Sequence, residues 1–322
     1  MRRCWSKSRP RRCFQNENRL KIAVSGATGL IGAALTLRLR NDGHDVVPLV
    51  RRSVRAGEQA IAWDPAAGNI DRSRLEGCDV VVNLAGESVF GRWTAAKKQR
   101  IQSSRVAGTR LVSEAIAGLE RRPRVLLAAS AVGFYGDRGA TELTEESRGG
   151  SDFLAQVAHE WETATDPAAR TGVRVANLRF GIVLARAGGM VAKLLPVFRL
   201  GLGGPIGSGA QYLSWIAIDD LVAATLHVLS TASLSGPINV TAPHPVPQLE
   251  FVRALGRVLR RPAVLPVPRF ALALAFGQEA ATMMAGGQRV LPARLLATGY
   301  RFRFGDLEPA LRQLLAAPRG GS

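Results

Sequence analysis

The segment "VSGATGLIG", Val24 to Gly32, decides the fold of this chain. Its glycines follow a short apolar segment and precede a longer one whose apolar residues recur every three or four positions. In that context the first glycine permits a tight turn, the second leaves room for a pyrophosphate, and the third lets a helix pack close to a strand. The N–H groups of the first helical turn then face the phosphates. We therefore expect a dinucleotide site with contacts from Gly26, Thr28, Gly29, Leu30, Ile31 and Gly32; the alternative is a tight strand-to-helix turn without a ligand.

The same alternation continues after the glycine segment and is typical of βαβ units around a parallel sheet. We expect strands at 21–25, 45–50, 80–84, 124–129, 173–178 and 237–241. We expect helices at 31–42, 94–119, 152–169 and 248–259, and another that begins near Asp219. This order predicts an α/β fold, a doubly wound Rossmann sheet with a smaller C-terminal α/β lobe.

The glycine-rich stretch after residue 181 suggests a division of the chain. Residues 21–181, with a strand from 236–241, are expected to form the nucleotide-binding domain. Residues 182–315 are expected to form a substrate-side loop and the C-terminal lobe, and residues 316–322 a tail. We interpret residues 1–20 as a disordered basic arm or as the product of a start codon placed too early; a transit-like leader is the third alternative.

Composition excludes several classes of protein. The 322 residues are 47% hydrophobic, which is enough for a substantial core, and no apolar run approaches the roughly 20 residues that cross a bilayer. Cys4, Cys13 and Cys78 form no C-x-x-C pair and have no local histidine cluster, so we expect neither a disulfide framework nor a metal site. These features predict a cytoplasmic protein without a membrane partner, either a monomer or a homodimer.

The formal net charge of +18 raises the question of nucleic acid. Residues 1–21 hold eight Lys and Arg against one Glu, and the remaining excess is spread as single arginines without aromatic residues between them. Nucleic-acid binding typically needs a clustered basic patch. We therefore expect a small-molecule substrate and no nucleic-acid partner.

Two arginines, Arg51 and Arg52, directly follow the second expected strand. A protein specific for NAD usually has an acidic residue there, on the ribose hydroxyls, whereas arginine can bind a 2′-phosphate. The pair predicts NADP(H) as the cofactor. The alternative is two solvated surface arginines in an arginine-rich protein.

Four longer segments carry a family resemblance. They are "NLAGE", "RWTAAKKQRIQSSRVAGT", "FRLGLGGPIGSGAQYLSWIAIDDL" and "GGQRVLPARLLATGYRF". From about Lys21 to Leu315 the chain resembles the atypical extended short-chain dehydrogenase/reductases that are called NAD(P)-dependent epimerase-like proteins with a C-terminal domain of unknown function. The resemblance implies that Leu84, Ala85 and Gly86 lie under the adenine-ribose, that Arg105 reaches the cofactor and that Leu184 caps its nicotinamide side.

Reductases of this superfamily use a serine with a Tyr-x-x-x-Lys pair as acid–base machinery. Ser130 matches the serine, but residues 151–170 contain neither tyrosine nor lysine. Tyr135 is the nearest phenol and becomes the candidate proton donor, with His159 or Glu160 as possible relays. We expect Trp161 to be a core residue and the neighbouring Glu162 to be a solvated carboxylate.

Two functions remain open on these residues. The first is oxidoreduction or epimerisation of a sugar-like substrate by hydride transfer, with Ser130 and Tyr135 as the catalytic residues. The second is a non-catalytic NADP(H)-binding regulator or sensor. The loop of residues 201–215 is expected to fold over the substrate with Gln211, Tyr212 and Ser214, and Asp219 with Asp220 to cap a helix.

Overall fold

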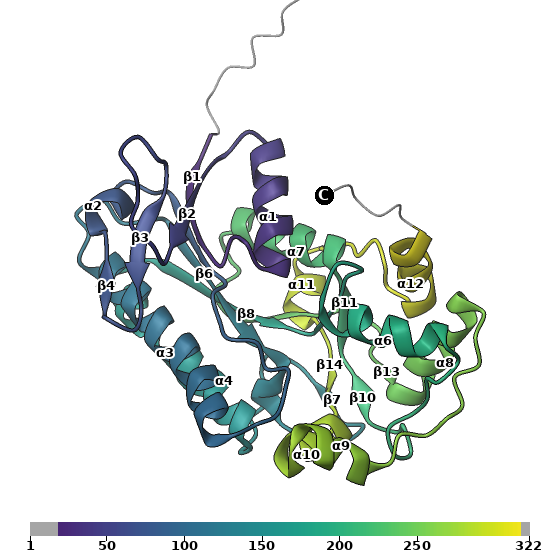
Figure 1. Ribbon diagram of the computed structural model, residues 1–322. Coiled ribbons are helices and arrows are strands. Elements are labelled where there is room, and N and C mark those ends of the chain that lie inside the picture. Colours follow the sequence, from purple (N-terminus) through teal and green to yellow (C-terminus); the bar gives the residue numbers. More distant parts are fainter. Residues whose placement is uncertain (1–18, 317–322) are drawn as a thin grey trace, which may run out of the picture.

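The computed structural model describes residues 19–316, except for five side chains between residues 269 and 284. Most of the expected arm (residues 1–20) and of the expected tail (residues 316–322) lies outside that range. Figure 1 shows two halves, a sheet flanked by helices and a smaller C-terminal lobe.

The central sheet has eight strands in the order β12-β8-β6-β5-β1-β2-β3-β4, and every neighbouring pair is parallel except β3 with β4. This confirms the doubly wound α/β fold. The strands are β1 Lys21–Ser25, β2 Asp45–Val50, β3 Ile61–Asp64, β4 Asn69–Ile70, β5 Val80–Asn83, β6 Val125–Ala131, β8 Arg174–Phe180 and β12 Gly236–Val240.

Helices cover both faces of this sheet because side chains of a strand alternate between its faces. Ile22 and Val24 of β1 pack with the helices of one face, and Ala23 packs with those of the other. The first face carries α1 (Leu30–Asn41) and α7 (Ile218–Ser230), and the second α2 (Arg72–Leu75), α3 (Ala95–Ala117), α4 (Phe153–Thr163) and α5 (Asp166–Ala169). No described helix is both long enough and apolar enough to span a membrane.

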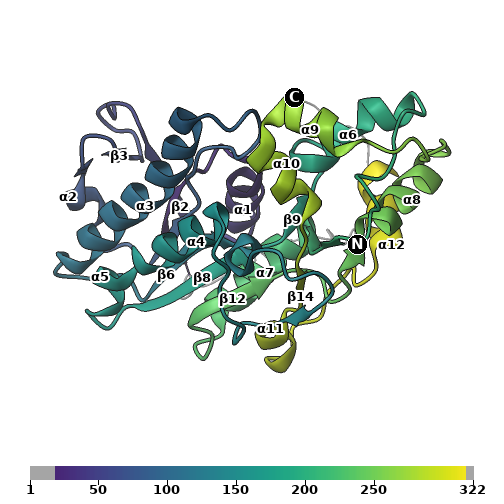
Figure 2. The same ribbon diagram turned by 90° about the horizontal axis from the view of Figure 1, so that it is seen from below.

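The C-terminal lobe has its own apolar core, built around α6, α8 and α12. One short strand pair, β14 with β7, joins it to the larger half, and the pairs β9 with β11 and β10 with β13 lie within the lobe. In Figure 2, α9 and α10 lie between the two halves. The remaining elements are η1 Val132–Tyr135, β7 Glu142–Leu143, β9 Ile182–Leu184, α6 Gly189–Arg199, β10 Tyr212–Leu213, β11 Trp215–Ala217, β13 Val246–Pro247, α8 Gln248–Leu259, α9 Arg269–Phe276, α10 Gln278–Ala285, β14 Arg289–Val290, α11 Ala293–Ala297 and α12 Leu307–Ala316.

Two expectations about helices need correction. The helix expected at 152–169 is broken between Thr163 and Asp166, because the ring of Pro167 clashes with the carbonyl four residues earlier and carries no N–H. The helix cap expected from Asp219 and Asp220 is also absent: the N-cap residue of α7 is Ala217, without a side-chain bond.

Asp220 instead anchors the segment that leads into the last helix. Its side chain is buried and accepts hydrogen bonds from the backbone N–H groups of Arg303 and Phe304, each at 2.8 Å. A carboxylate that accepts two N–H bonds fixes the local backbone strongly. The exposed neighbour Asp219 makes only a 3.7 Å ion pair with Arg303.

We predict that Asp220→Ala lowers the free energy of unfolding by about 2–4 kcal/mol, because two buried N–H donors lose a charged acceptor. Urea unfolding followed by circular dichroism measures the change. Asp219→Ala is the matched control, with an expected loss below about 0.5 kcal/mol. Equal losses in the two variants would contradict the role given to Asp220.

Candidate cofactor-binding site

The glycine loop between β1 and α1 has the close contacts that its sequence predicts. A Cβ at Gly32 would lie 2.1 Å from the carbonyl oxygen of Gly26, so α1 can approach this turn only without a side chain at that position. Gly26 has φ +68°, which favours glycine, and a Cβ there would lie 3.0 Å from the backbone at Leu84 and Ala85. The loop is thus packed directly on the segment that follows β5.

The start of α1 offers unpaired N–H groups to a ligand. Its N-cap residue is Gly29, which has no side chain to accept hydrogen bonds from the first turn. Thr28 and Gly29 are exposed, and Leu30 and Ile31 are half-buried. An anion is favoured at such a helix start by the N–H groups and by the helix dipole together.

A buried hydrogen-bond network holds the segment after β5, which forms the floor of the site. The Ser25 hydroxyl donates to Asn83 and accepts from the backbone N–H groups of Leu84 and Ala85, at 3.1 and 3.2 Å. The Asn83 amide donates to Thr109 of α3 over 2.7 Å. The positions expected under the adenine-ribose are therefore held rigidly between β1 and β5.

Arg105 lies beside this floor. Its Nη1 donates to the carbonyl of Glu87 at 2.8 Å, and its guanidinium lies 5.0 Å from the Trp161 ring centre. A Cβ at Gly86 would touch Cζ of Arg105 at 3.4 Å. Burial lowers the pKa of Arg105 to about 10, which leaves the side chain charged at neutral pH.

The two arginines after β2 differ in how they are held. Arg52 forms an exposed ion pair with Glu58, which also accepts the N–H of Arg55 at 3.1 Å. The hydrogen bonds from Arg52 and from that N–H lower the pKa of Glu58 to about 2. Arg51 is exposed and makes no ion pair within residues 19–316. Arg51 is therefore the more available cation.

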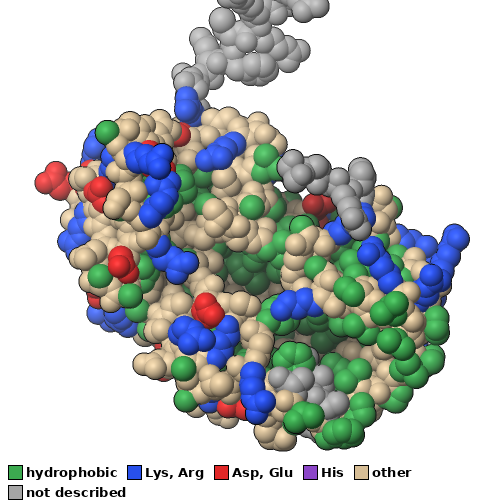
Figure 3. Space-filling model, in the orientation of Figure 1, with side chains coloured by type: hydrophobic (Ala, Val, Ile, Leu, Met, Phe, Trp, Pro, Cys, Tyr) green, Lys and Arg blue, Asp and Glu red, His purple; other side chains and the backbone are tan. Residues whose placement is uncertain are grey.

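The C-terminal lobe meets the glycine loop at the start of α6. A Cβ at Gly188 would lie 3.2 Å from Cδ1 of Leu30. Leu184, the residue expected to cap the nicotinamide, is 1% exposed and packs in the apolar core of the lobe. Figure 3 shows a hollow between the two halves, with hydrophobic side chains in its depth.

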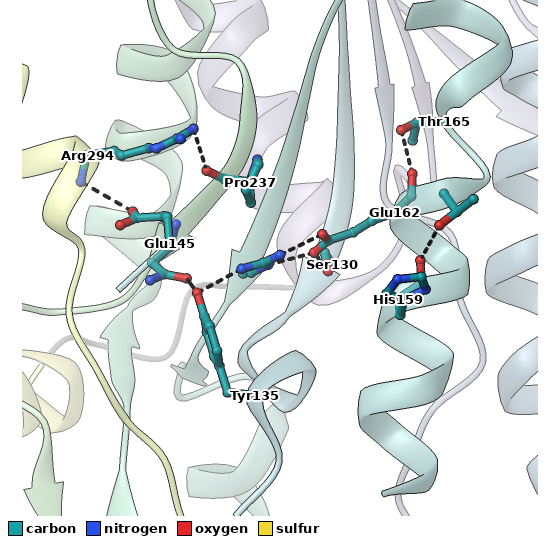
Figure 4. Close-up of polar contacts among 11 residues, drawn as sticks. Ser130, Tyr135, Glu145, His159, Glu162, Thr165, Pro237 and Arg294 are labelled. Atoms are coloured by element: carbon teal, nitrogen blue, oxygen red, sulfur yellow. Dashed lines mark hydrogen bonds and ion pairs between the residues drawn. The ribbon is translucent and has the colours of Figure 1, made fainter. Parts of the chain in front are cut away.

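Ser130 and Tyr135 belong to one buried polar network around an ion pair (Figure 4). The Ser130 hydroxyl donates to Glu162 at 2.6 Å, and Glu162 binds Arg179 through both carboxylate oxygens at 2.7 and 2.8 Å. Arg179 also donates to the Tyr135 hydroxyl at 2.9 Å, and that hydroxyl donates to Asn239 at 2.8 Å. Every member is thus satisfied inside the protein.

This arrangement does not favour Tyr135 as a proton donor. The side chain is fully buried, and its only O–H proton is directed to Asn239. Burial raises the pKa of Tyr135, and the neighbouring Arg179 only partly offsets it. Among the expected relays, the ring of His159 stacks on Phe134 and Glu160 accepts a hydrogen bond from Gln102.

Glu162, Arg179 and Asn239 are the residues that sequence reasoning missed. Glu162 was expected to be a solvated carboxylate, but its side chain is only 13% exposed, and that of Arg179 is 4% exposed. The available signal was the arginine inside the apolar run "VANLRF", because a charged residue on a buried strand requires a partner.

Two of the three residues expected to contact substrate from the 201–215 loop, Tyr212 and Ser214, are hydrogen-bonded to Gln288 of the C-terminal segment, and Gln211 is bonded within the loop. The Ser214 hydroxyl donates to the carbonyl of Gln288 at 2.6 Å, and the carbonyl of Tyr212 accepts the N–H of Gln288 at 3.3 Å. Gln211 donates to the carbonyl of Ile206 at 3.2 Å. This geometry gives the three residues a structural role, and contact with substrate stays a prediction.

Comparisons with known proteins agree with this architecture. The profile of the NAD dependent epimerase/dehydratase family matches residues 22–240, and that of a domain of unknown function (DUF1731) matches residues 267–314. Epimerase family protein YfhF of Bacillus subtilis is 40% identical over 302 residues, which cover 92% of this chain and 98% of YfhF.

Two of the similar solved structures, each covering 92% of this chain, are also at least 35% identical to it. The crystal structure of human epimerase family protein SDR39U1 (isoform2) with NADPH is 35% identical, has a TM-score of 0.83 and is covered to 99%. A nucleoside-diphosphate sugar epimerase from Corynebacterium glutamicum is 38% identical, has a TM-score of 0.75 and is covered to 58%.

We predict that Arg179→Met lowers the free energy of unfolding by about 3–5 kcal/mol at pH 7–8, because it leaves the Glu162 carboxylate buried without a cation. Urea unfolding at pH 8, followed by circular dichroism, measures the loss.

The matched control is Arg38→Met, which removes the exposed ion pair with Asp42 on α1. Its expected cost is at most about 1 kcal/mol. A cost for Arg179→Met that is equally small would show that the network is not organised by this ion pair.

Proposed function

The chain belongs to the NAD dependent epimerase/dehydratase family, and on that premise we propose that it binds NADP(H) at the carboxyl edge of its sheet. The observation that carries the proposal is the close contact of Gly32 with the Gly26 carbonyl. This contact places the start of α1, which has no side-chain cap, directly beside the glycine loop. The human relative that was crystallised with NADPH supports it, since 35% of the residues are identical.

The residues present fit the parts of this cofactor. The N–H groups of the first turn of α1 would hold the pyrophosphate, and Leu84 to Gly86 would lie along the adenine-ribose. Arg51 would bind the 2′-phosphate, and Arg52 would join it if Glu58 released it. When bound, NADPH supplies a hydride to an acceptor carbon.

The protein could use that cofactor in two ways, which differ in whether a side chain must donate or accept a proton. Oxidoreduction or epimerisation at a sugar-like carbon is supported by the family and by the hollow beside the glycine loop. A non-catalytic NADP(H)-binding protein is supported by a specific observation: the Ser130 and Tyr135 hydroxyls both donate to internal acceptors. We favour the second function, because no candidate donor has a free hydroxyl.

We predict that Arg51→Ala weakens NADPH binding about tenfold or more and leaves NADH binding unchanged, because a charge-assisted bond to the 2′-phosphate contributes roughly 1.5–3 kcal/mol. Glu58→Gln should tighten NADPH binding, since it frees Arg52 and removes a negative charge near the phosphate. Fluorescence titration of each variant with both nucleotides gives the values. Parallel effects on NADPH and NADH would contradict the assignment of Arg51.

We predict that Tyr135→Phe leaves NADPH affinity unchanged but lowers the free energy of unfolding by about 1–3 kcal/mol, because Asn239 and Arg179 lose a buried partner. The variant should be compared with the wild type on a panel of aldehydes, ketones and nucleotide sugars with NADPH consumption as the readout. Turnover by the wild type that falls about 10²-fold or more in Tyr135→Phe would restore Tyr135 as a proton donor.

A further inference from the structure

The C-terminal lobe exposes an unusual set of large apolar side chains, which we call the apolar tip. Leu200 and Val264 are each 73% exposed, Phe270 is 75% exposed and Leu274 is 76% exposed. Figure 3 shows hydrophobic side chains gathered over this lobe. A cluster of this kind on a water-soluble domain typically marks an interaction surface. The apolar tip comprises Val197, Leu200, Leu202, Val264, Leu265, Phe270 and Leu274.

These side chains belong to one surface because their segments lie side by side. The backbone of Leu265 donates to Gly203 at 3.2 Å, and that of Val267 donates to Pro205 at 2.8 Å. Gly204 packs so closely on the Leu265 carbonyl that a Cβ there would lie 1.7 Å from its oxygen. α9 follows directly, and its exposed Phe270 and Leu274 are four residues apart, so they lie on one face of the helix.

The charges along the segments that carry the apolar tip are mainly positive. Residues 189–207 and 251–278 contain seven Lys and Arg and no Asp or Glu; the exposed Glu250 and Glu279 directly adjoin the second stretch, and Arg257 pairs with Glu308. Arg199, Arg260 and Arg261 are exposed, and within the described part of the chain none of the three forms an ion pair. Arg261 is held beside the end of α6 by a 2.9 Å bond to the Arg199 carbonyl. The surface therefore combines protruding apolar groups with uncompensated positive charge.

This combination favours one occupant. A second copy would bring two sets of like charges face to face, which is unfavourable. A protein partner would need pockets for its anchoring side chains, but the groups here project outward. Projecting apolar side chains with a cationic rim suit the interface of an anionic bilayer, where the apolar groups enter the acyl boundary and the arginines meet the headgroups.

We propose that the apolar tip docks this protein peripherally on a membrane surface rich in anionic phospholipid. The proposal is independent of the cofactor and revises the expectation of no membrane partner that rested on the absence of a long apolar run. The side chains of Phe270 and Leu274 insert into the acyl boundary of the bilayer. Arg260 and Arg261 attract the anionic headgroups.

Flotation of the full chain with lipid vesicles tests the proposal. The protein should float with vesicles of phosphatidylcholine and phosphatidylglycerol in equal parts, but not with phosphatidylcholine alone, and added salt should weaken the binding. The double variant Phe270→Ser, Leu274→Ser should bind at least about tenfold more weakly, since burial of each large apolar side chain is lost. Arg260→Gln with Arg261→Gln should weaken binding about tenfold.

Leu37→Ser is the matched control, because Leu37 is 63% exposed on α1, outside the apolar tip, and its replacement should leave binding unchanged. Thermal unfolding of each variant confirms that the exposed substitutions preserve the fold. The proposal is overturned if the wild type does not float with anionic vesicles, if phosphatidylcholine alone binds equally well, or if the tip variants bind like the wild type. A dimer that dissociates in Phe270→Ser, Leu274→Ser, without vesicle binding, would also overturn it in favour of a second copy.

Discussion

The contact between Gly32 and the carbonyl of Gly26 is the constraint on which the rest of the molecule depends. It lets α1 begin directly above the carboxyl ends of β1 and β5, with its first N–H groups unpaired by any side chain. The same turn packs on Leu84 and Ala85 below and, through Leu30, on Gly188 of the C-terminal lobe. The position of the cofactor site therefore depends on this glycine turn, which also contacts the C-terminal lobe.

A second constraint is the ion pair of Glu162 with Arg179, in which the arginine is buried and the carboxylate is partly exposed. This pair holds the hydroxyls of Ser130, which matches the serine of the usual reductases, and of Tyr135, the substitute proton donor that the sequence offers. When all hydrogen bonds of such a charge pair are made, the side chains around it are held in place. Proton transfer through them is then disfavoured. The family frame is thus retained while its usual acid–base pair is absent from α4.

The sequence predicted those parts of the fold that depend on neighbouring residues. β1, β2 and α8 have the expected boundaries, because alternation, capping and periodicity act within a few residues. The β3 and β4 strands were missed because they are short and depend on Trp63, which packs against Gly108 of α3. The pairing of Glu162 with Arg179 joins a helix to a strand, and local patterns do not specify such a contact.

The glycine-rich loop of residues 201–215 shows the same limit. The loop was expected to fold over a substrate, which stays a prediction, and Gly204 and Gly209 are positions where a Cβ would meet the backbone or side chain of a neighbouring segment. Glycine marks a close approach, and the sequence alone does not tell a ligand from another part of the chain. The neighbour is Leu265 for Gly204, and it is Gln248 with Leu249 for Gly209.

In the proposed NADP(H) site, the glycine turn holds the pyrophosphate and Arg51 binds the 2′-phosphate. Titration of the unmodified protein with NADPH and with NADH, followed by nucleotide fluorescence, tests this site most directly. We expect saturable binding of NADPH that is at least about tenfold tighter than that of NADH, since only NADPH offers a 2′-phosphate to the arginine. Equal affinity for the two nucleotides, or no binding of either, would contradict it.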